Sequence, residues 1–461
     1  MSALRAIRRP ERLVMTVLPF LLLLGWAALL APAAAEAQSV AQLLVHPREH
    51  DAVVAIAARF PAGARDDPGE ADGAAFLLGR VLEEEGTRRL AELSSRISVE
   101  VDRSEFMVTM VAPAEDWEEA WRRVIELLEG GPLSESAVIS ARERHRERLL
   151  FEEGAPGRAF DIEQSRYLYG SNHPAARPVA GTLGGIDRLD RSALESQRST
   201  LLRWEEAVIG VVGPVSLEEA GATFRGPAER VGPPPPVPPP AAAAPAPGDA
   251  AEPAPTPAPT GPRVLMEERT GPLRAPSTSA TGSPWTSGDR RVIDQDVTST
   301  WIMVAWPLPR ESPMILRDFL VHLVDRALNP SPPDPGVYRI DAEIRTIEDA
   351  SVLIVAASVD PRTAYTWEDR ILGTLESLEA APPEGAFFEL ARRQYRAHRL
   401  LEHAVPEERA RWMTRRHAEG GEVPRIPAQV WGLTREGISG LAAVRGEPRV
   451  LIFGPLSVMD R

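Results

Sequence analysis

Three residues near the start of the chain have the types and spacing to bind a metal: His46, Glu49 and His50, within the sequence His-Pro-Arg-Glu-His. Two histidines one helical turn apart can bind Zn²⁺, and a glutamate beside them can activate a zinc-bound water. Here Pro47 disfavours a helical residue before it. The motif also lies between an apolar run at 43–45 and a β-rich run that starts near residue 52. We therefore predict an exposed hairpin turn between strands at this position, and no zinc site.

The other histidines form no better ligand set. His398 and His403 are five residues apart in an Arg-rich helical segment, so they point to different faces of that helix. His145 lies among arginines and glutamates, on a face that we expect to be exposed. His173 precedes a proline, where we expect a structural role.

The composition excludes several other kinds of chemistry. The chain has 461 residues and no cysteine, so it can form no disulfide, thiolate zinc site or cysteine nucleophile. Its formal net charge of −14 leaves no broad basic face, and we expect no nucleic-acid partner. Neither a phosphate-binding loop nor a Gly-x-Ser-x-Gly nucleophile motif occurs.

Residues 1–37 are typical of a signal peptide. Four arginines precede an apolar run at 13–30, and Ala-Glu-Ala at 35–37 has the small residues that a signal peptidase requires. The alternative is an uncleaved anchor, because the apolar run approaches the length that spans a bilayer. We predict an exported protein, periplasmic or extracellular, that is soluble after cleavage and contacts a membrane only through an uncleaved signal segment.

A Pro/Ala-rich linker at 229–290 divides the mature chain into lobes at 38–228 and 291–461. The two lobes resemble each other. Trp117 opens an amphipathic helix pair in the first lobe, and Trp367 opens a pair with the same internal spacing in the second. Each lobe also ends in an apolar strand closed by Gly-Pro, at 208–214 and 450–455. These repeats indicate two copies of one unit.

Each unit has the pattern of an α+β fold. In the first lobe, a β-rich run at 52–60 precedes a helix at 73–85, and 98–101 with 106–111 alternate as a hairpin does. The second lobe repeats this order with a strand at 300–306, a helix at 315–328 and a hairpin formed by 338–345 and 352–359. We predict two homologous lobes, each an antiparallel sheet with helices packed on one face.

The first lobe resembles the insulinase/pitrilysin (inverzincin) metallopeptidase family. The similarity rests on the segment Phe-Pro-Ala-Gly-Ala-Arg at 60–65, the Gly-Ala-Ala at 73–75, and the Gly-Thr at 86–87. Tyr-Gly at 169–170, His-Pro at 173–174 and Gly-Thr at 181–182 match a second family landmark. The resemblance implies a helix with His-x-x-Glu-His that holds zinc in active relatives.

This chain lacks those ligands, so the resemblance implies a degenerate, non-catalytic member. Counted forward from Gly73, the three ligand and base positions are Phe76, Gly79 and Arg80. Counted back from Gly-Thr at 86–87, they are Leu77, Arg80 and Val81. Neither register holds a ligand or a base, and an arginine repels a cation. We expect no catalytic residue, no metal site and no cofactor.

Active relatives also use an arginine and a tyrosine of the second lobe to hold the substrate backbone. The nearest match is Tyr338, in a Gly-Val-Tyr sequence that is one residue short of the family pattern. No arginine precedes it at the family spacing. We interpret Tyr338 as a weak substrate-binding candidate whose alternative role is that of a core or strand residue.

Three hypotheses for the function follow. The first is an exported non-catalytic protein that acts as a partner or scaffold of an active zinc peptidase subunit and binds peptides or protein. The second is an active zinc-dependent endopeptidase with an atypical site. The third is a stand-alone periplasmic binding or scaffold protein. A neighbouring gene that encodes an intact His-x-x-Glu-His would favour the first.

Overall fold

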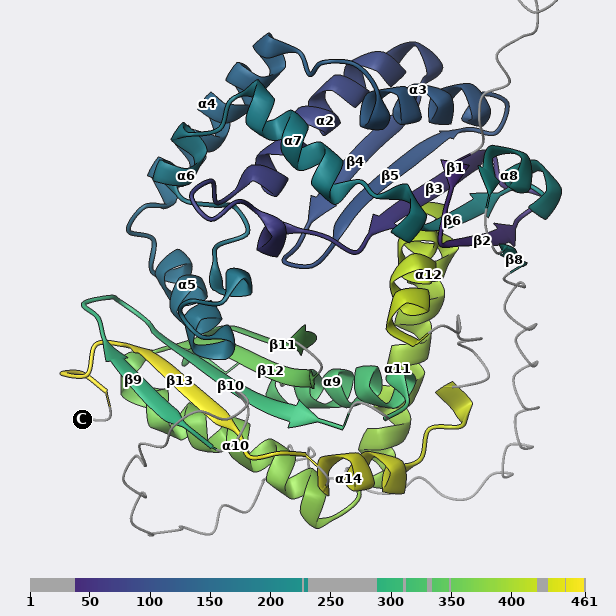
Figure 1. Ribbon diagram of the computed structural model, residues 1–461. Helices are drawn as coiled ribbons and strands as arrows, with labels where there is room; N and C mark the ends of the chain where they lie inside the picture. The colour runs from purple at the N-terminus through teal and green to yellow at the C-terminus, as the bar shows by residue number, and fades with distance from the viewer. Residues whose placement is uncertain are drawn as a thin grey trace, which may run out of the picture.

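The computed structural model describes residues 38–225, 228–230, 288–309, 312–329, 334–347, 350–420, 430–443 and 445–459. The predicted signal peptide and most of the predicted linker lie outside these residues. Figure 1 shows two lobes, each a sheet covered by helices, with helices α5 and α12 between them. Among the described residues, no helix has both the length and the apolar character to span a membrane.

The sheet of the first lobe has the strand order β4-β5-β3-β6-β2-β8. Its strands are β2 (Gln42–Pro47), β3 (Val53–Phe60), β4 (Arg96–Val101), β5 (Phe106–Pro113), β6 (Val208–Gly213) and β8 (Ala228–Arg230). Strand β3 is antiparallel to both β5 and β6, whereas β2 is parallel to β6 and to β8. A small parallel pair, β1 (Gln38–Ser39) and β7 (Phe224–Arg225), lies apart from this sheet.

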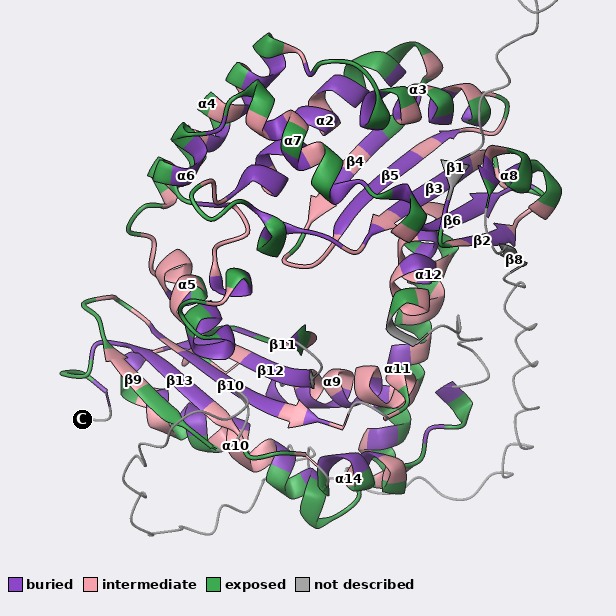
Figure 2. Ribbon diagram, viewed as in Figure 1, coloured by how far each residue is buried: buried purple, intermediate pink, exposed green. Residues whose placement is uncertain are grey.

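All helices of the first lobe except α5 (Pro156–Tyr169) pack on one face of this sheet. They are α2 (Ala74–Leu90), α3 (Trp117–Glu129), α4 (Glu135–Glu152), α6 (Leu183–Asp187), α7 (Arg191–Leu201) and α8 (Leu217–Thr223). Apolar side chains of α2 and α3 join those of the central strands in a single buried cluster. Burying this apolar surface is the main force that holds the helical layer to the sheet. Figure 2 shows that the strands are buried along most of their length.

The second lobe repeats this plan with the strand order β11-β12-β10-β13-β9. Its strands are β9 (Arg290–Asp294), β10 (Thr300–Leu308), β11 (Val337–Ile347), β12 (Ala350–Val359) and β13 (Arg449–Gly454). Its helices are α9 (Met314–Leu328), α10 (Ala364–Ala380), α11 (Gly385–Ala404), α12 (Pro406–Gly420) and α14 (Arg435–Ala443). Strand β10 is antiparallel to β12 and β13, and β9 is parallel to β13.

The two lobes exchange one helix each (Figure 1). Phe160 of α5, in the first lobe, stacks on Trp301 and lies edge-on to Phe453 in the sheet of the second lobe. In return, Ala410 and Met413 of α12 join a buried cluster on the sheet of the first lobe. Helices α5 and α12 follow equivalent helices in the repeat, so the exchange is reciprocal. Each lobe therefore completes the core of the other.

The predicted two-lobed α+β architecture is confirmed, with two differences. The sheets are mixed, because parallel strands are added at one edge of each antiparallel centre. Helices also cover both faces of each sheet, because the second face receives the helix of the other lobe. The predicted hairpins are present as β4 with β5 and β11 with β12.

Candidate functional site

Helix α2 begins at a turn where two glycines meet. Gly73 caps the helix with φ of 94°, and Gly181 has φ of 74°. Both angles lie in the left-handed region, which glycine adopts without a steric cost. A Cβ added to Gly181 would lie 2.3 Å from the carbonyl oxygen of Asp72. The two family landmarks at 73–75 and 181–182 therefore pack against each other and fix the start of α2.

The carboxylate of Asp67 holds the first turn of α2. It accepts hydrogen bonds from the backbone N–H of Gly73 at 2.7 Å and of Ala75 at 2.8 Å, and from the Gln197 side-chain amide at 3.1 Å. These bonds satisfy N–H groups that have no partner within a helix. Burial raises the pKa of Asp67 to about 7, against the lowering effect of the backbone donors. Asp67 thus has a structural role: its carboxylate caps the N-terminus of α2.

The two possible ligand registers on α2 differ in where their side chains lie. Leu77 and Val81 are fully buried in the core. Phe76 and Arg80 instead line a pocket of about 480 Å³ between α2 and α4. Residues at i and i+4 share a helix face, which is the arrangement that two metal ligands need. In the register counted forward from the start of the helix, the two ligand positions, Phe76 and Arg80, therefore face a pocket, whereas Gly79 between them faces the sheet.

The side chains at these three positions do not fit a zinc ion. Arg80 donates a hydrogen bond to the carbonyl oxygen of Val99 at 2.7 Å and forms an ion pair with Glu83 at 2.7 Å. Its guanidinium also lies 5.2 Å from the centre of the Phe76 ring. Gly79 is packed against the sheet, where a Cβ would lie 3.0 Å from Val101 Cγ2. A cation and a phenyl ring thus occupy the places where ligands would be.

His145 of α4 closes this pocket from the opposite side. Its ring centre lies 4.7 Å from that of Phe76, and its Nε2 is 2.7 Å from the carbonyl oxygen of Ala180. Only 4% of His145 is exposed, so the prediction of an exposed face is wrong. The reason is that the loop containing Ala180 folds over α4. Burial lowers the pKa of His145, which favours the neutral ring.

The His-x-x-Glu-His sequence lies in a different part of the lobe. His46 is buried in β2, opposite Val212 of β6, whereas His50 follows in an exposed turn. Glu49 lines a separate pocket beside the start of α8. The predicted hairpin is wrong, because β6 lies between β2 and β3 in the sheet. No helix carries the two histidines, so the spacing that the motif needs is not formed.

The remaining predicted residues are dispersed. Tyr338 lies in β11 as a strand residue, but 62% of it is exposed, so it is no part of the core. The Nε2 atom of His398 lies 3.0 Å from a carboxylate oxygen of Glu402, whereas the ring of His403 packs 4.4 Å from that of Trp412. His173 caps a short helical turn at 174–176, in the structural role expected. The described residues contain no group of three His, Cys, Asp or Glu side chains placed to hold a metal.

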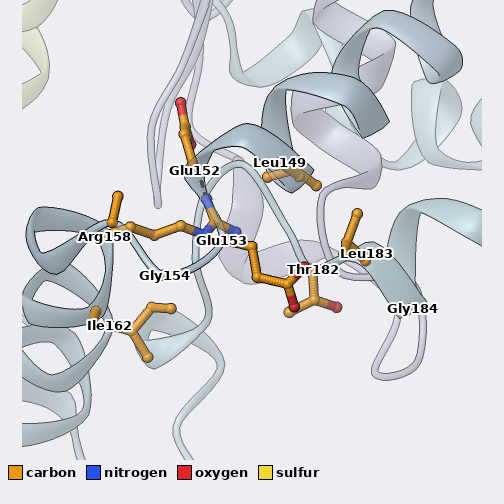
Figure 3. A pocket seen from close by; sticks show the side chains of 11 residues that line it. Leu149, Glu152, Glu153, Gly154, Arg158, Ile162, Thr182, Leu183 and Gly184 are labelled. Atoms are coloured by element: carbon orange, nitrogen blue, oxygen red, sulfur yellow. Dashed lines mark hydrogen bonds and ion pairs between the residues drawn. The ribbon is translucent and has the colours of Figure 1, made fainter.

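Two further pockets lie along α4 and α5. The first, about 470 Å³, shares Arg148 with the pocket on α2 and is lined by side chains of both lobes, including Arg103 and Arg345. The second, about 400 Å³, lies at the junction of α4 and α5 (Figure 3). There Arg158 spans from α5 to Glu152 at 3.2 Å and donates to the carbonyl oxygen of Gly181.

Sequence reasoning missed these arginines. The Arg-rich character of α4 is visible in the sequence, but it indicates a solvated helix face. Arg345 lies in a different lobe, and nothing in its neighbourhood on the chain points to α5. Only the folded structure brings Arg103, Arg148 and Arg345 to one pocket.

Comparisons with known proteins identify the fold. No family model matches the chain, and neither does any curated protein. An inactive domain of an M16 peptidase from Pseudomonas fluorescens superposes with a TM-score of 0.66 at 14% identity, covering 91% of this chain and 97% of that one. A protease from Helicobacter pylori gives 0.66 at 12% identity, covering 89% and 97%. The periplasmic protease PqqL from Escherichia coli gives 0.64 at 10% identity, and the match covers 89% of this chain and 44% of PqqL.

Proposed function

We propose that this chain, which has the two-lobed fold of the M16 (insulinase/pitrilysin) peptidases, is an exported non-catalytic protein that partners an active zinc peptidase subunit and binds peptides. The fold is shared with both active and inactive proteins of this kind. The fold alone therefore leaves the activity open, and the residues on α2 carry the argument.

The proposal rests on the side chains of α2 that line the pocket between α2 and α4. The positions that face the pocket at i and i+4 are Phe76 and Arg80, neither of which can bind zinc. No carboxylate can replace Gly79 without displacing Val99 or Val101 of β4. A fixed guanidinium in the pocket also repels a divalent cation. We accordingly derive no catalytic step through a metal.

The role as a partner is supported by what proteins of this fold do elsewhere. One chain of Complex III2 from Candida albicans superposes with a TM-score of 0.61, at 11% identity and over 90% of this chain, and it is thus part of a complex. The neighbour from Pseudomonas fluorescens is described as an inactive domain of a peptidase. An inactive copy of the fold can retain a binding surface after its catalytic groups are lost.

The test is co-purification from the native host, followed by activity assays. We expect the chain to elute with a protein that carries an intact His-x-x-Glu-His. The mixture should cleave unstructured peptides, and the purified chain alone should not. Zinc-dependent cleavage by the chain alone, abolished by a chelator and by His46→Ala with His50→Ala, would overturn the proposal.

A further inference from the structure

Three pockets follow one another along α4 and α5, and each shares lining residues with the next. The pocket on α2 and the pocket between the lobes share Arg148. The latter and the pocket at the α4–α5 junction share Glu152, Ala155, Arg158 and Ile162. Each pocket has a volume of 400–480 Å³, within the range of ligand sites. We refer to the three together as the α4 groove.

The charge of the α4 groove is opposite to that of the chain. The two pockets that meet at Arg148 are lined by more arginines than carboxylates, although the whole chain has a net charge of −14. The arginines are Arg80, Arg88, Arg103, Arg144, Arg148, Arg158 and Arg345, and the carboxylates are Glu83, Glu84, Glu152 and Asp161. A concave, low-dielectric wall concentrates the field of such charges and attracts anions.

Arg345 is paired with Glu343, whereas Arg103 beside it donates its hydrogen bonds to neutral acceptors. Arg103 donates to the carbonyl oxygen of Ala175 at 3.0 Å and to Ser165 Oγ at 2.5 Å. Its nearest carboxylate, that of Asp102, is 3.9 Å away and mostly exposed. Burial and then the charge of Arg345 lower the pKa of Arg103, against the opposite effect of Tyr169, Asp102 and Glu343.

Two more arginines compete for one carboxylate. Arg148 donates to Glu152 Oε1 at 2.8 Å, and Arg158 lies 3.2 Å from Glu152 Oε2. The Arg148 side chain is 60% exposed where the pockets meet. On the α2 side, Arg80 is paired with Glu83 and Arg144 with Glu84. An exposed guanidinium such as that of Arg148 can bind an added carboxylate through two parallel hydrogen bonds.

We propose that the α4 groove binds an extended peptide segment rich in Asp and Glu. A single small anion would fill only one of the three pockets, whereas an extended chain can reach across them. A nucleic acid is a poor fit, because Glu83, Glu84 and Glu152 interrupt the basic wall that a continuous phosphate backbone would follow. Phe76 and His145 add an aromatic floor for apolar contacts. This inference rests on the proposed function and assigns its peptide class.

The experiment measures binding of fluorescein-labelled peptides to the full chain by fluorescence anisotropy. The probes are a ten-residue peptide of alternating Glu and Ala and its counterpart with Gln for Glu. We expect the acidic peptide to bind at least about tenfold more tightly. Arg148→Gln with Arg345→Gln should weaken its binding about tenfold and leave the Gln peptide unchanged. The control is Arg166→Gln on α5, which removes an exposed charge outside the groove and should have little effect.

Each other outcome overturns the inference in a recognisable way. Equal binding of both peptides would reject the acidic class and leave peptide binding by the chain intact. If Arg166→Gln weakens binding of the acidic peptide as much as the groove variant does, the binding depends on the overall charge of the chain and not on the α4 groove. Displacement of the probe by free glutamate at the concentration that the peptide needs would indicate a small-anion site. If neither peptide binds while circular dichroism shows all variants folded, both this inference and the peptide-binding part of the proposed function fail.

Discussion

The ring of Phe76 on α2 lies 4.7 Å from the ring of His145 on α4, and the guanidinium of Arg80 lies 5.2 Å from the centre of the Phe76 ring. This stack occupies the helix face where active proteins with this fold are expected to hold their metal. An aromatic pair with a cation on it is a stable packing arrangement. The helix has thereby become a packing element that borders an arginine-lined groove.

Restoring the ligand set should destabilise the protein without creating an enzyme. The triple variant Phe76→His, Gly79→Glu and Arg80→His loses the hydrogen bond from Arg80 to Val99 and forces a side chain against Val101. We expect a loss of about 2–4 kcal/mol in the free energy of unfolding. Thermal melting and a zinc-supplemented peptide assay test this. Zinc-dependent cleavage with an unchanged melting temperature would show that our account of this helix is mistaken.

Substitution of two helical glycines by alanine should change the free energy of unfolding in opposite directions, because Gly86 of α2 is packed in the core and Gly373 of α10 is not. A Cβ on Gly86 would lie 2.7 Å from Ile97 Cγ2 and 3.2 Å from Leu127 Cδ2, both in the core. Gly86→Ala should therefore cost about 1–3 kcal/mol. Gly373 is also helical, but a Cβ there meets nothing within 4 Å. Gly373→Ala should be neutral or stabilising by up to about 1 kcal/mol. Urea denaturation of both variants checks the sign, and equal effects would refute this packing of α2.

The exchange of helices between the lobes predicts a large effect at Phe160. Its side chain is almost fully buried between α5 and the sheet of the second lobe. Phe160→Ala should lower the free energy of unfolding by about 3–5 kcal/mol and weaken the contact between the lobes. The matched control is Phe151→Ala near the end of α4, where the side chain is 90% exposed and the change should stay within about 0.5 kcal/mol. Similar melting temperatures for the two variants would argue against the exchange.

Acid should weaken the contact between α11 and α12 through His403. Burial, and then the charge of Arg409, lower the pKa of His403 to about 3 from an ordinary value of 6.5. The unfolded chain therefore binds this proton more readily than the folded chain does. The stability that the neutral ring contributes is complete above pH 6.5 and is lost as the pH falls from there toward 3. The difference in unfolding free energy between the wild type and His403→Gln should shrink over this window. A difference independent of pH would exclude a buried neutral His403.

Local elements could be predicted from the sequence because their signals are local. Apolar spacing predicted α2, and alternation predicted the β4–β5 hairpin. Long-range pairing was not predictable in this way. The parallel edge strands and the exchange of α5 and α12 depend on contacts between segments far apart in the chain. Likewise, His145 has an arginine-rich neighbourhood on the chain, and only the loop containing Ala180 buries it.

From the sequence, only the absence of zinc ligands at the candidate site could be predicted. The resemblance to a known helix showed which residues are missing, but two registers fitted the sequence. The structure separates them, because Leu77 and Val81 lie in the core whereas Phe76 and Arg80 line a pocket. The arginines of the α4 groove come from both lobes, so no motif could have grouped them.

The zinc content of the purified protein tests the central claim most directly. Elemental analysis should find far less than one zinc per chain after purification in zinc-containing buffer and gel filtration, because Phe76, Gly79 and Arg80 provide no ligand. The same low content is expected for His46→Ala with His50→Ala. One tightly bound zinc per chain, lost in that double variant, would contradict the account and would make the His-x-x-Glu-His sequence at 46–50 a true metal site.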